Sequence, residues 1–349
     1  MANLSIAGLC LLASPAFGQA AAAIAWQAPA SVAVETEERS FANGPTTLSG
    51  TLYLPRGGTR LPAVVVTHAA SEPTRDLPLY NHLKEMLPAL GMAVFVYDRR
   101  GSGKSGGDLQ QSDYDLLADD AIAAQKMLAQ DPRIDARKIG FWGLSQGGWL
   151  SLLAASRSPQ TAFAISLSAP MTTPDVQMNF ATENILRIKG YPQADIDQML
   201  ATRHAVDGYL RGQVDRAVAQ AALDAAVQKP WFELIYMGKT LADPAKSRWL
   251  KEMGHDPMKT LDRVTAPALV IYGAADPWVP VATSMERLRA VAPKHPNIET
   301  AVIAGADHAM MLSVDPKTQV DPKFHGLAPE SPAYIGLLAG WLTRQGFAR

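Results

Sequence analysis

The feature that most constrains the fold of this chain is an alternation of buried-strand patterns with helical patterns. Residues 63–67 form a continuous apolar, β-branched run, which is typical of a strand buried on both faces. Comparable runs recur at 92–97, 139–142, 164–167, 268–272 and 300–303. Segments with helical spacing lie between most of them, at 79–90, 114–128, 147–155, 281–291 and 333–342. The alternation predicts an α/β fold with a mostly parallel sheet covered by helices on both faces.

Two stretches depart from this pattern. Residues 48–54 alternate apolar with polar or small side chains, which predicts a half-exposed antiparallel strand. Residues 171–257 contain no clear buried-strand pattern and are helical in character, at 194–199, 205–210, 214–227 and 244–253. Because the sheet pattern resumes afterwards, we expect residues 31–170 and 258–349 to form one core. The stretch 171–257 is expected to be a helical cap over the carboxyl edge of the sheet.

The first residues of the 349-residue chain resemble a targeting segment. Residues 4–16 are apolar and small, and no charged residue precedes Glu35. A run this short fits a secretory signal better than a membrane span. We therefore expect a signal peptide over residues 1–20, a secreted or periplasmic protein, and no membrane span in the mature chain. Cys10 is the only cysteine and would leave with the signal, so no disulfide is expected.

The overall charge bears on possible partners. The chain has 32 Lys and Arg against 33 Asp and Glu, a formal net charge of −1. No basic excess is present to hold a phosphate backbone, so nucleic acid is not an expected partner.

A G-x-S-x-G motif, Gly143-Leu144-Ser145-Gln146-Gly147, lies directly after one predicted strand and directly before a predicted helix. This context is the one in which the motif forms a sharp turn with an exposed serine hydroxyl. Glycines at both ends remove Cβ atoms that would clash in such a turn. We expect Ser145 to be a nucleophile. An ordinary strand-to-helix loop is the alternative.

A serine hydroxyl needs a base and an acid that orients the base. His308 is the histidine that follows the last predicted strand directly, and Asp276 follows the strand before it. Both loops lie at the carboxyl edge of the sheet, and the chain order Ser, Asp, His matches that of one class of triad. Asp307 is a weaker candidate because adjacent side chains rarely face each other. A neutral His308 is needed as base, so activity is expected to fall below about pH 6.5.

An acyl-transfer site also needs two backbone N–H groups for the developing oxyanion. One donor is expected from Gln146, the residue after the nucleophile. The second is expected from the loop after residues 63–67, where Ala69 is the first choice and Ala70 the alternative. His68 is expected to hold this loop in shape.

These motifs together resemble the α/β-hydrolase superfamily over roughly residues 35–345. The matching segments are His68-Ala69-Ala70 with Arg75-Asp76, residues 97–105, residues 143–148, residues 273–280 and Asp307-His308. The chain is similar to bacterial serine esterases that have a His-Gly-Ser-Gly-Pro loop and a helical cap. It departs from that loop, since Ala69 and Ser71 replace the two glycines. The resemblance implies an α/β-hydrolase fold and hydrolysis of a small-molecule carboxylic ester through an acyl-enzyme, with no cofactor and no metal.

Several alternatives remain open in the sequence. An amidase or peptidase would use the same three residues, and a binding protein could retain an inactive triad. Trp231, Tyr236 and Trp278 are candidate substrate-binding residues, although packing of the cap onto the core would also explain them. Arg99 and Arg100 are expected to form structural salt bridges, with anion binding as the alternative.

Overall fold

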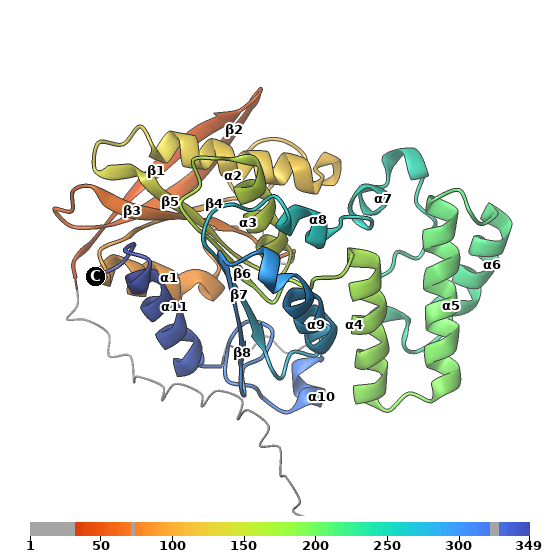
Figure 1. Cartoon of the computed structure of the whole chain (residues 1–349). Coiled ribbons are helices and arrows are strands. Elements are labelled where there is room, and N and C mark those ends of the chain that lie inside the picture. Colours follow the sequence, from red (N-terminus) through yellow and green to blue (C-terminus); the bar gives the residue numbers. More distant parts are fainter. Residues whose placement is uncertain (1–31, 71–73, 322–327) are drawn as a thin grey trace, which may run out of the picture.

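The computed structural model describes residues 32–70, 74–321 and 328–349 of the chain. The predicted signal peptide and Cys10 lie outside these ranges. The described residues form one mixed sheet of eight strands in the order β1-β2-β4-β3-β5-β6-β7-β8 (Figure 1). The strands are β1 (Val34–Asn43), β2 (Thr46–Pro55), β3 (Leu61–Thr67), β4 (Ala93–Tyr97), β5 (Ile134–Leu144), β6 (Ala164–Leu167), β7 (Ala268–Gly273) and β8 (Ile298–Ile303).

The directions of the strands determine which loops lie at the same edge of the sheet. From β4 to β8 neighbouring strands pair in parallel, whereas β1–β2 and β2–β4 are antiparallel. The carboxyl ends of β3, β5, β7 and β8 therefore lie at the same edge of the sheet. The interior strands are almost free of solvent, as the runs of β-branched residues predict. In β3, for example, Val64, Val65 and Val66 are buried.

Helices cover both faces of the sheet, which confirms the predicted α/β architecture. One face packs against α1 (Asn81–Ala89) and α11 (Pro332–Arg344), whose apolar residues share a buried cluster with β3, β4 and β5. The other face packs against α2 (Tyr114–Leu128), α3 (Gln146–Arg157) and α9 (Val281–Val291). The helices lie on either side of the strands in Figure 1.

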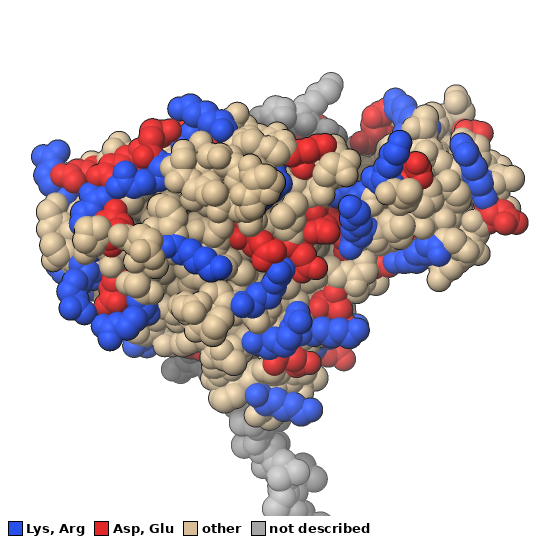
Figure 2. All heavy atoms as spheres, turned by 90° about the horizontal axis from the view of Figure 1, so that it is seen from above, with Lys and Arg blue, Asp and Glu red and all other residues tan. Residues whose placement is uncertain are grey.

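Between β6 and β7 the chain is helical, and we keep the name cap for residues 171–257. Its main helices are α4 (Pro174–Lys189), α5 (Gln193–Leu210), α6 (Arg216–Val227) and α7 (Arg248–Glu252), and the short α8 (Pro257–Leu261) leads back to the core. α4, α5 and α6 stand beside the core in Figure 1 and form a projecting lobe in Figure 2. The cap has an apolar interior of its own, which includes Leu186, Met199 and Leu223.

Some elements differ from those expected from the sequence. β1 was not expected, and it pairs with β2 along ten residues at the edge of the sheet. α4 was not expected either, and α5 is one continuous helix where two shorter ones were predicted. α10 (Pro316–Gln319) is a further short helix that the pattern did not indicate.

The surface of the protein carries charges of both signs. On the face seen in Figure 2, Lys and Arg are mixed with Asp and Glu over both the core and the cap. Across residues 32–70, 74–321 and 328–349, no helix has both the length and the apolar character needed to cross a bilayer.

Candidate active site

Ser145 occupies a strained turn between β5 and α3. Its backbone has φ 57° and ψ −122°, a region that side chains with a Cβ rarely adopt. The turn holds this conformation because the Ser145 amide donates to the Leu167 carbonyl of β6 at 2.8 Å. The next turn of the chain closes with the Gly148 amide donating to the Ser145 carbonyl at 2.8 Å. The serine is thereby fixed at the amino end of α3, as the motif predicted.

The glycines around Ser145 are required by close backbone contacts. A Cβ at position 143 would collide with the carbonyl of Gly147 and with the Thr67 hydroxyl. A Cβ at position 147 would collide with the carbonyl of Thr67. The Thr67 hydroxyl also lies 2.7 Å from the Gly147 carbonyl oxygen, so the end of β3 and the start of α3 are in direct contact. The sequence Gly-x-Ser-x-Gly thus brings the nucleophile candidate against the loop that follows β3.

His308 and Asp276 form a hydrogen-bonded pair at the same edge of the sheet. Nδ1 of His308 lies 2.7 Å from Oδ2 of Asp276, whose side chain is buried. The other carboxylate oxygen of Asp276 accepts the Trp278 amide at 2.8 Å, which fixes the carboxylate plane. Because a carboxylate accepts, Nδ1 carries the proton and Nε2 of His308 is left as the basic nitrogen. The Ser145 hydroxyl makes no hydrogen bond with the described residues, so its contact with His308 is not formed in this structure.

The neighbouring Asp307 has a different role. Its Oδ1 accepts the amides of Ala309 and Met311, both at 2.9 Å, and so organises its own loop. The His308 imidazole contacts Asp276 instead, as the sequence argument expected. Burial lowers the pKa of His308, but the charge of Asp276, the hydrogen bond to it and the charge of Asp307 outweigh burial and leave that pKa raised.

Two amides are available for an oxyanion, and one of them is the second choice made from the sequence. The amide of Ala69, the first choice, points to the Tyr80 hydroxyl at 3.4 Å. Within the described ranges, the amides of Ala70 and Gln146 donate no hydrogen bond. The Gln146 amide is one of the unpaired donors at the start of α3. Ala70 and Gln146 are therefore the two open donors.

A buried hydrogen-bond chain holds this loop, as expected for His68. Nε2 of His68 contacts the Tyr97 carbonyl, and Nδ1 lies 3.1 Å from the Tyr80 hydroxyl. A carbonyl can only accept, so Nε2 donates and Nδ1 accepts from Tyr80. The Tyr80 oxygen then accepts the Ala69 amide. His68 is thus used in shaping the loop.

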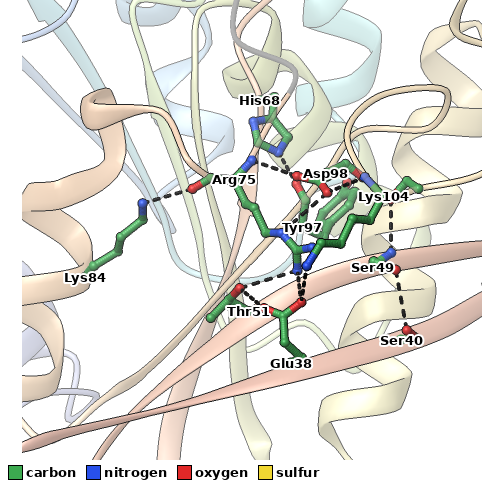
Figure 3. Close-up of polar contacts among 11 residues, drawn as sticks. Glu38, Ser40, Ser49, Thr51, His68, Arg75, Lys84, Tyr97, Asp98 and Lys104 are labelled. Atoms are coloured by element: carbon green, nitrogen blue, oxygen red, sulfur yellow. Dashed lines mark hydrogen bonds and ion pairs between the residues drawn. The ribbon is translucent and has the colours of Figure 1, made fainter.

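Further polar contacts anchor the chain that follows the loop (Figure 3). The Arg75 amide donates to Oδ1 of Asp98 at 3.0 Å, and the Arg75 guanidinium contacts both Asp98 and Glu38. Asp98 also accepts the Lys104 amide at 2.8 Å. Lys84 of α1 donates to the Arg75 carbonyl at 2.9 Å. The loops after β3 and β4 are therefore tied together.

The two arginines after β4 behave differently from each other. Arg100 forms the expected structural salt bridge, with Nε 3.0 Å from Oδ2 of the buried Asp120. Arg99 forms no ion pair with any described residue. Its Nη2 donates instead to the carbonyl oxygens of His68 at 2.5 Å and Ala69 at 3.0 Å. Sequence reasoning missed this contact, because a pair of adjacent arginines does not reveal which one has a carboxylate partner.

The cap contacts the loop that carries Asp276. From α4, Gln177 donates to the Trp278 carbonyl at 3.0 Å and Asn184 to the Pro277 carbonyl at 2.8 Å. The Trp278 ring packs edge-to-face on Tyr236 with centroids 5.7 Å apart, and Tyr236 is 58% exposed. Trp231, by contrast, is 0% exposed inside the cap's own apolar interior. The prediction that Trp231 binds substrate is therefore withdrawn, whereas Tyr236 and Trp278 lie beside the site.

No group of three or more His, Cys, Asp or Glu side chains suited to a metal ion occurs in the part of the chain that the structure describes.

The sheet, the serine turn and the histidine–aspartate pair define an α/β-hydrolase. Residues 62–315 match the family model described as serine aminopeptidase, S33, and the chain belongs to this family. Among solved structures, an esterase of Pyrococcus furiosus superposes with a TM-score of 0.58 at 19% identity and covers 89% of this chain and 91% of its own. The proline iminopeptidase of Mycobacterium smegmatis gives a TM-score of 0.52 at 18% identity, and the match covers 88% of this chain and 98% of its own. At these identities the two structures support the fold alone.

Curated relatives match this chain either at low identity over most of its length or at higher identity over about a third of it. A monoacylglycerol lipase of Mycolicibacterium smegmatis is 24% identical over 279 residues, 76% of this chain and 86% of its own. The match to a polyketide transferase of Penicillium crustosum is 32% identical over 128 residues, and that to the monoglyceride lipase of Rattus norvegicus is 30% over 121. These two matches span only 40% and 38% of the relatives' own lengths.

Proposed function

We propose that this protein is a serine hydrolase that cleaves carboxylic esters through an acyl-enzyme, with Ser145, His308 and Asp276 as its triad. The observation that carries the proposal is the 2.7 Å bond between His308 and Asp276 at the sheet edge where the strained Ser145 turn lies. A backbone held in a costly conformation around a serine is typical of a nucleophile. The names of the lipase and esterase relatives agree with ester substrates.

The proposed reaction proceeds in two halves. Ser145 Oγ attacks the ester carbonyl carbon while Nε2 of His308 takes the hydroxyl proton, and Asp276 stabilises the imidazolium. The tetrahedral oxyanion is held by the amides of Gln146 and Ala70. The C–O bond to the alcohol then breaks as His308 returns the proton to the leaving oxygen. Water, deprotonated by the same histidine, releases the acid and restores the serine.

We assign the second oxyanion donor to Ala70 in place of Ala69. The Ala69 amide is directed at the Tyr80 hydroxyl, and an amide has one hydrogen to donate. The cap would close over the ester, with Tyr236 and Trp278 contacting its acyl or alcohol group. The apolar faces of these two rings suit a hydrocarbon chain.

Cleavage of an amide is the second candidate, because the family to which the chain belongs is described as serine aminopeptidase. The same triad serves both reactions, so the leaving group decides between them. An amine leaves less readily than an alcohol and depends more strongly on the proton that His308 delivers.

The experiment is a comparison of wild type with Ser145→Ala. We expect a fluorophosphonate probe to label the wild type once per chain, and the label to be absent from Ser145→Ala. A series of p-nitrophenyl esters of increasing acyl length, run beside p-nitroanilides and short peptides, then ranks kcat/KM. Higher values for anilides or peptides would favour the amidase. Folded protein that neither takes the label nor hydrolyses any substrate would instead indicate a binding protein.

A further inference from the structure

Arg99 is a buried cation for which the proposed triad has no use. It is 2% exposed and lies directly after β4. Its Nη1 is buried without a hydrogen-bond partner among the described residues, although Arg100 beside it is paired with Asp120. A buried charge without a counter-charge costs several kcal/mol by order of magnitude. A chain that retains such a group is expected to gain something from it.

Among the described residues, the carboxylate that acts on Arg99 does not neutralise it. Glu252 of α7 interacts with it electrostatically, but Glu252 is already paired with Arg248 at 2.8 Å. Burial raises the pKa of Glu252 to about 7, against the opposing effect of Arg248. Near neutral pH this carboxyl is therefore only partly ionised. Arg99 itself remains charged, because a guanidinium does not deprotonate in proteins.

The direction of the Arg99 hydrogen bonds gives the cation a role. Nη2 donates to the carbonyl of Ala69 at 3.0 Å, and that carbonyl belongs to the same peptide group as the Ala70 amide. In a trans peptide the C=O and N–H bonds point in opposite directions. A donor that holds the carbonyl on one side therefore turns the Ala70 N–H to the other side. The bond to the His68 carbonyl at 2.5 Å fixes the preceding peptide in the same way, with its N–H towards Tyr80.

The contact also changes the strength of the amide donor. A cation bound to a peptide oxygen draws electron density from the nitrogen, which makes the N–H a better donor. The effect is largest when the acceptor is an anion in a site shielded from water. It would therefore favour the tetrahedral oxyanion over the neutral ester carbonyl, which is the differential binding that accelerates a reaction.

We propose that Arg99 is a positioning residue of the oxyanion hole, which orients and polarises the Ala69–Ala70 peptide so that the Ala70 N–H stabilises the transition state. The proposal rests on the hydrolase function proposed above. It assigns Arg99 no contact with the substrate. The unpaired charge is then explained, because its counter-ion is the oxyanion that forms during each reaction cycle.

The test uses Arg99→Met, Arg99→Lys and Arg99→Gln in the full-length protein, with active sites counted by complete fluorophosphonate labelling. Arg99→Met is expected to lower kcat per active site by about 10²-fold, in the range caused by loss of one oxyanion donor, with KM within about threefold. Affinity for a trifluoromethyl ketone, which forms an oxyanion adduct on the serine, should fall by the same factor. The acidic limb of the pH profile should not move. Lysine, which keeps the charge, is expected to recover more activity than glutamine.

Arg203→Met is the matched control. Arg203 is also a buried arginine that donates to a backbone carbonyl, that of Ile235 at 2.8 Å, but it does so inside the cap. The Arg203→Met substitution should lower the melting temperature without weakening the ketone adduct. Equal losses in Arg99→Met and Arg203→Met, or an unchanged kcat per active site in Arg99→Met, would overturn the proposal. A rise in KM confined to esters that carry a carboxylate would overturn it too, by assigning Arg99 to a substrate anion. If Ser145→Ala retains hydrolysis, the proposed function itself fails.

Discussion

At the scale of single residues, the His308 imidazole is subject to opposing electrostatic effects. Burial favours its neutral form, whereas Asp276 and Asp307 favour the charged form and leave the pKa raised above 6.5. The base must be neutral to act, so activity is lost as the pH falls through this raised pKa. The acidic limb of kcat/KM is therefore expected above pH 6.5, higher than the sequence alone suggested. A pH–rate profile with p-nitrophenyl acetate measures it.

Asp276→Asn provides the complementary test. Removing the carboxylate charge leaves burial, which lowers the pKa of His308, as the main influence on that pKa. The acidic limb of the pH profile should therefore shift to lower pH. The amide also favours the wrong imidazole tautomer, and kcat is expected to drop by about 10⁴-fold. Asp307→Asn is the control, because Asp307 accepts loop amides rather than the imidazole. If Asp307→Asn reduced kcat as strongly as Asp276→Asn, the assignment of the acid would be wrong.

Residue identities show what a single sequence can and cannot predict about the site. The sequence could place Ser145, Asp276 and His308 at one edge of the sheet, because each follows a recognisable strand and parallel strands bring such loops together. The sequence favoured Ala69 over Ala70 as oxyanion donor, but this choice depends on where one amide points, and the Ala69 amide points to Tyr80. Trp231 was misassigned for a related reason. The sequence does not show whether a tryptophan side chain packs inside the cap or faces a ligand, and Trp231 packs inside.

At the scale of elements, the turn between β5 and α3 depends on direct backbone contact. Gly143→Ala would place a Cβ against the Gly147 carbonyl and Thr67, so α3 must shift away from β3. We expect a loss of about 2–3 kcal/mol in the free energy of unfolding and severe loss of activity. Urea unfolding and ester hydrolysis measure the two effects.

Gly254→Ala is the matched control for that substitution. A Cβ at position 254 would meet no heavy atom within 4 Å, and stability should change by no more than about 0.5 kcal/mol. A Gly143→Ala protein that was as stable and active as Gly254→Ala would show that the turn is less crowded than described.

At the same scale, hydrogen bonds from α4 hold the loop that carries Asp276. Asn184→Ala removes a 2.8 Å hydrogen bond to the Pro277 carbonyl. Such a bond contributes about 1 kcal/mol, so a loosened acid loop should reduce kcat/KM by about fivefold. Gln193→Ala, which affects only an exposed bond to Asp197 on α5, should leave kcat/KM unchanged. An unaltered kcat/KM in Asn184→Ala would mean that the acid loop holds its position without the cap.

The elements that the sequence did not reveal share a physical cause. β1 carries the charged residues Glu35, Glu37 and Arg39 at half-buried positions, so it lacks the apolar run that identified the interior strands. It pairs along one side only, and charged side chains at such an edge discourage pairing with another chain. α4 and the middle of α5 also have weak apolar periodicity.

At the scale of the whole molecule, we propose that residues 1–20 direct export and are removed. This stretch lies outside the described residues, so the proposal stands on its apolar sequence. Expression of the full chain in a Gram-negative host should yield a protein in the periplasmic fraction that begins near residue 21. Intact-mass measurement identifies the first residue, and a variant with charged residues in the 4–16 stretch is the control. Full-length protein confined to the cytoplasm would contradict the proposal.

The position of the cap in the chain has a consequence for how such a protein can change over evolutionary time. Ser145 precedes the 171–257 insertion, Asp276 and His308 follow it, and both junctions lie beside neighbouring strands β6 and β7. One continuous stretch of coding sequence can therefore be exchanged or remodelled while the bond-breaking residues keep their places. Under the proposed function, preference for a substrate and the ability to cleave it would be inherited as separable parts of the same chain.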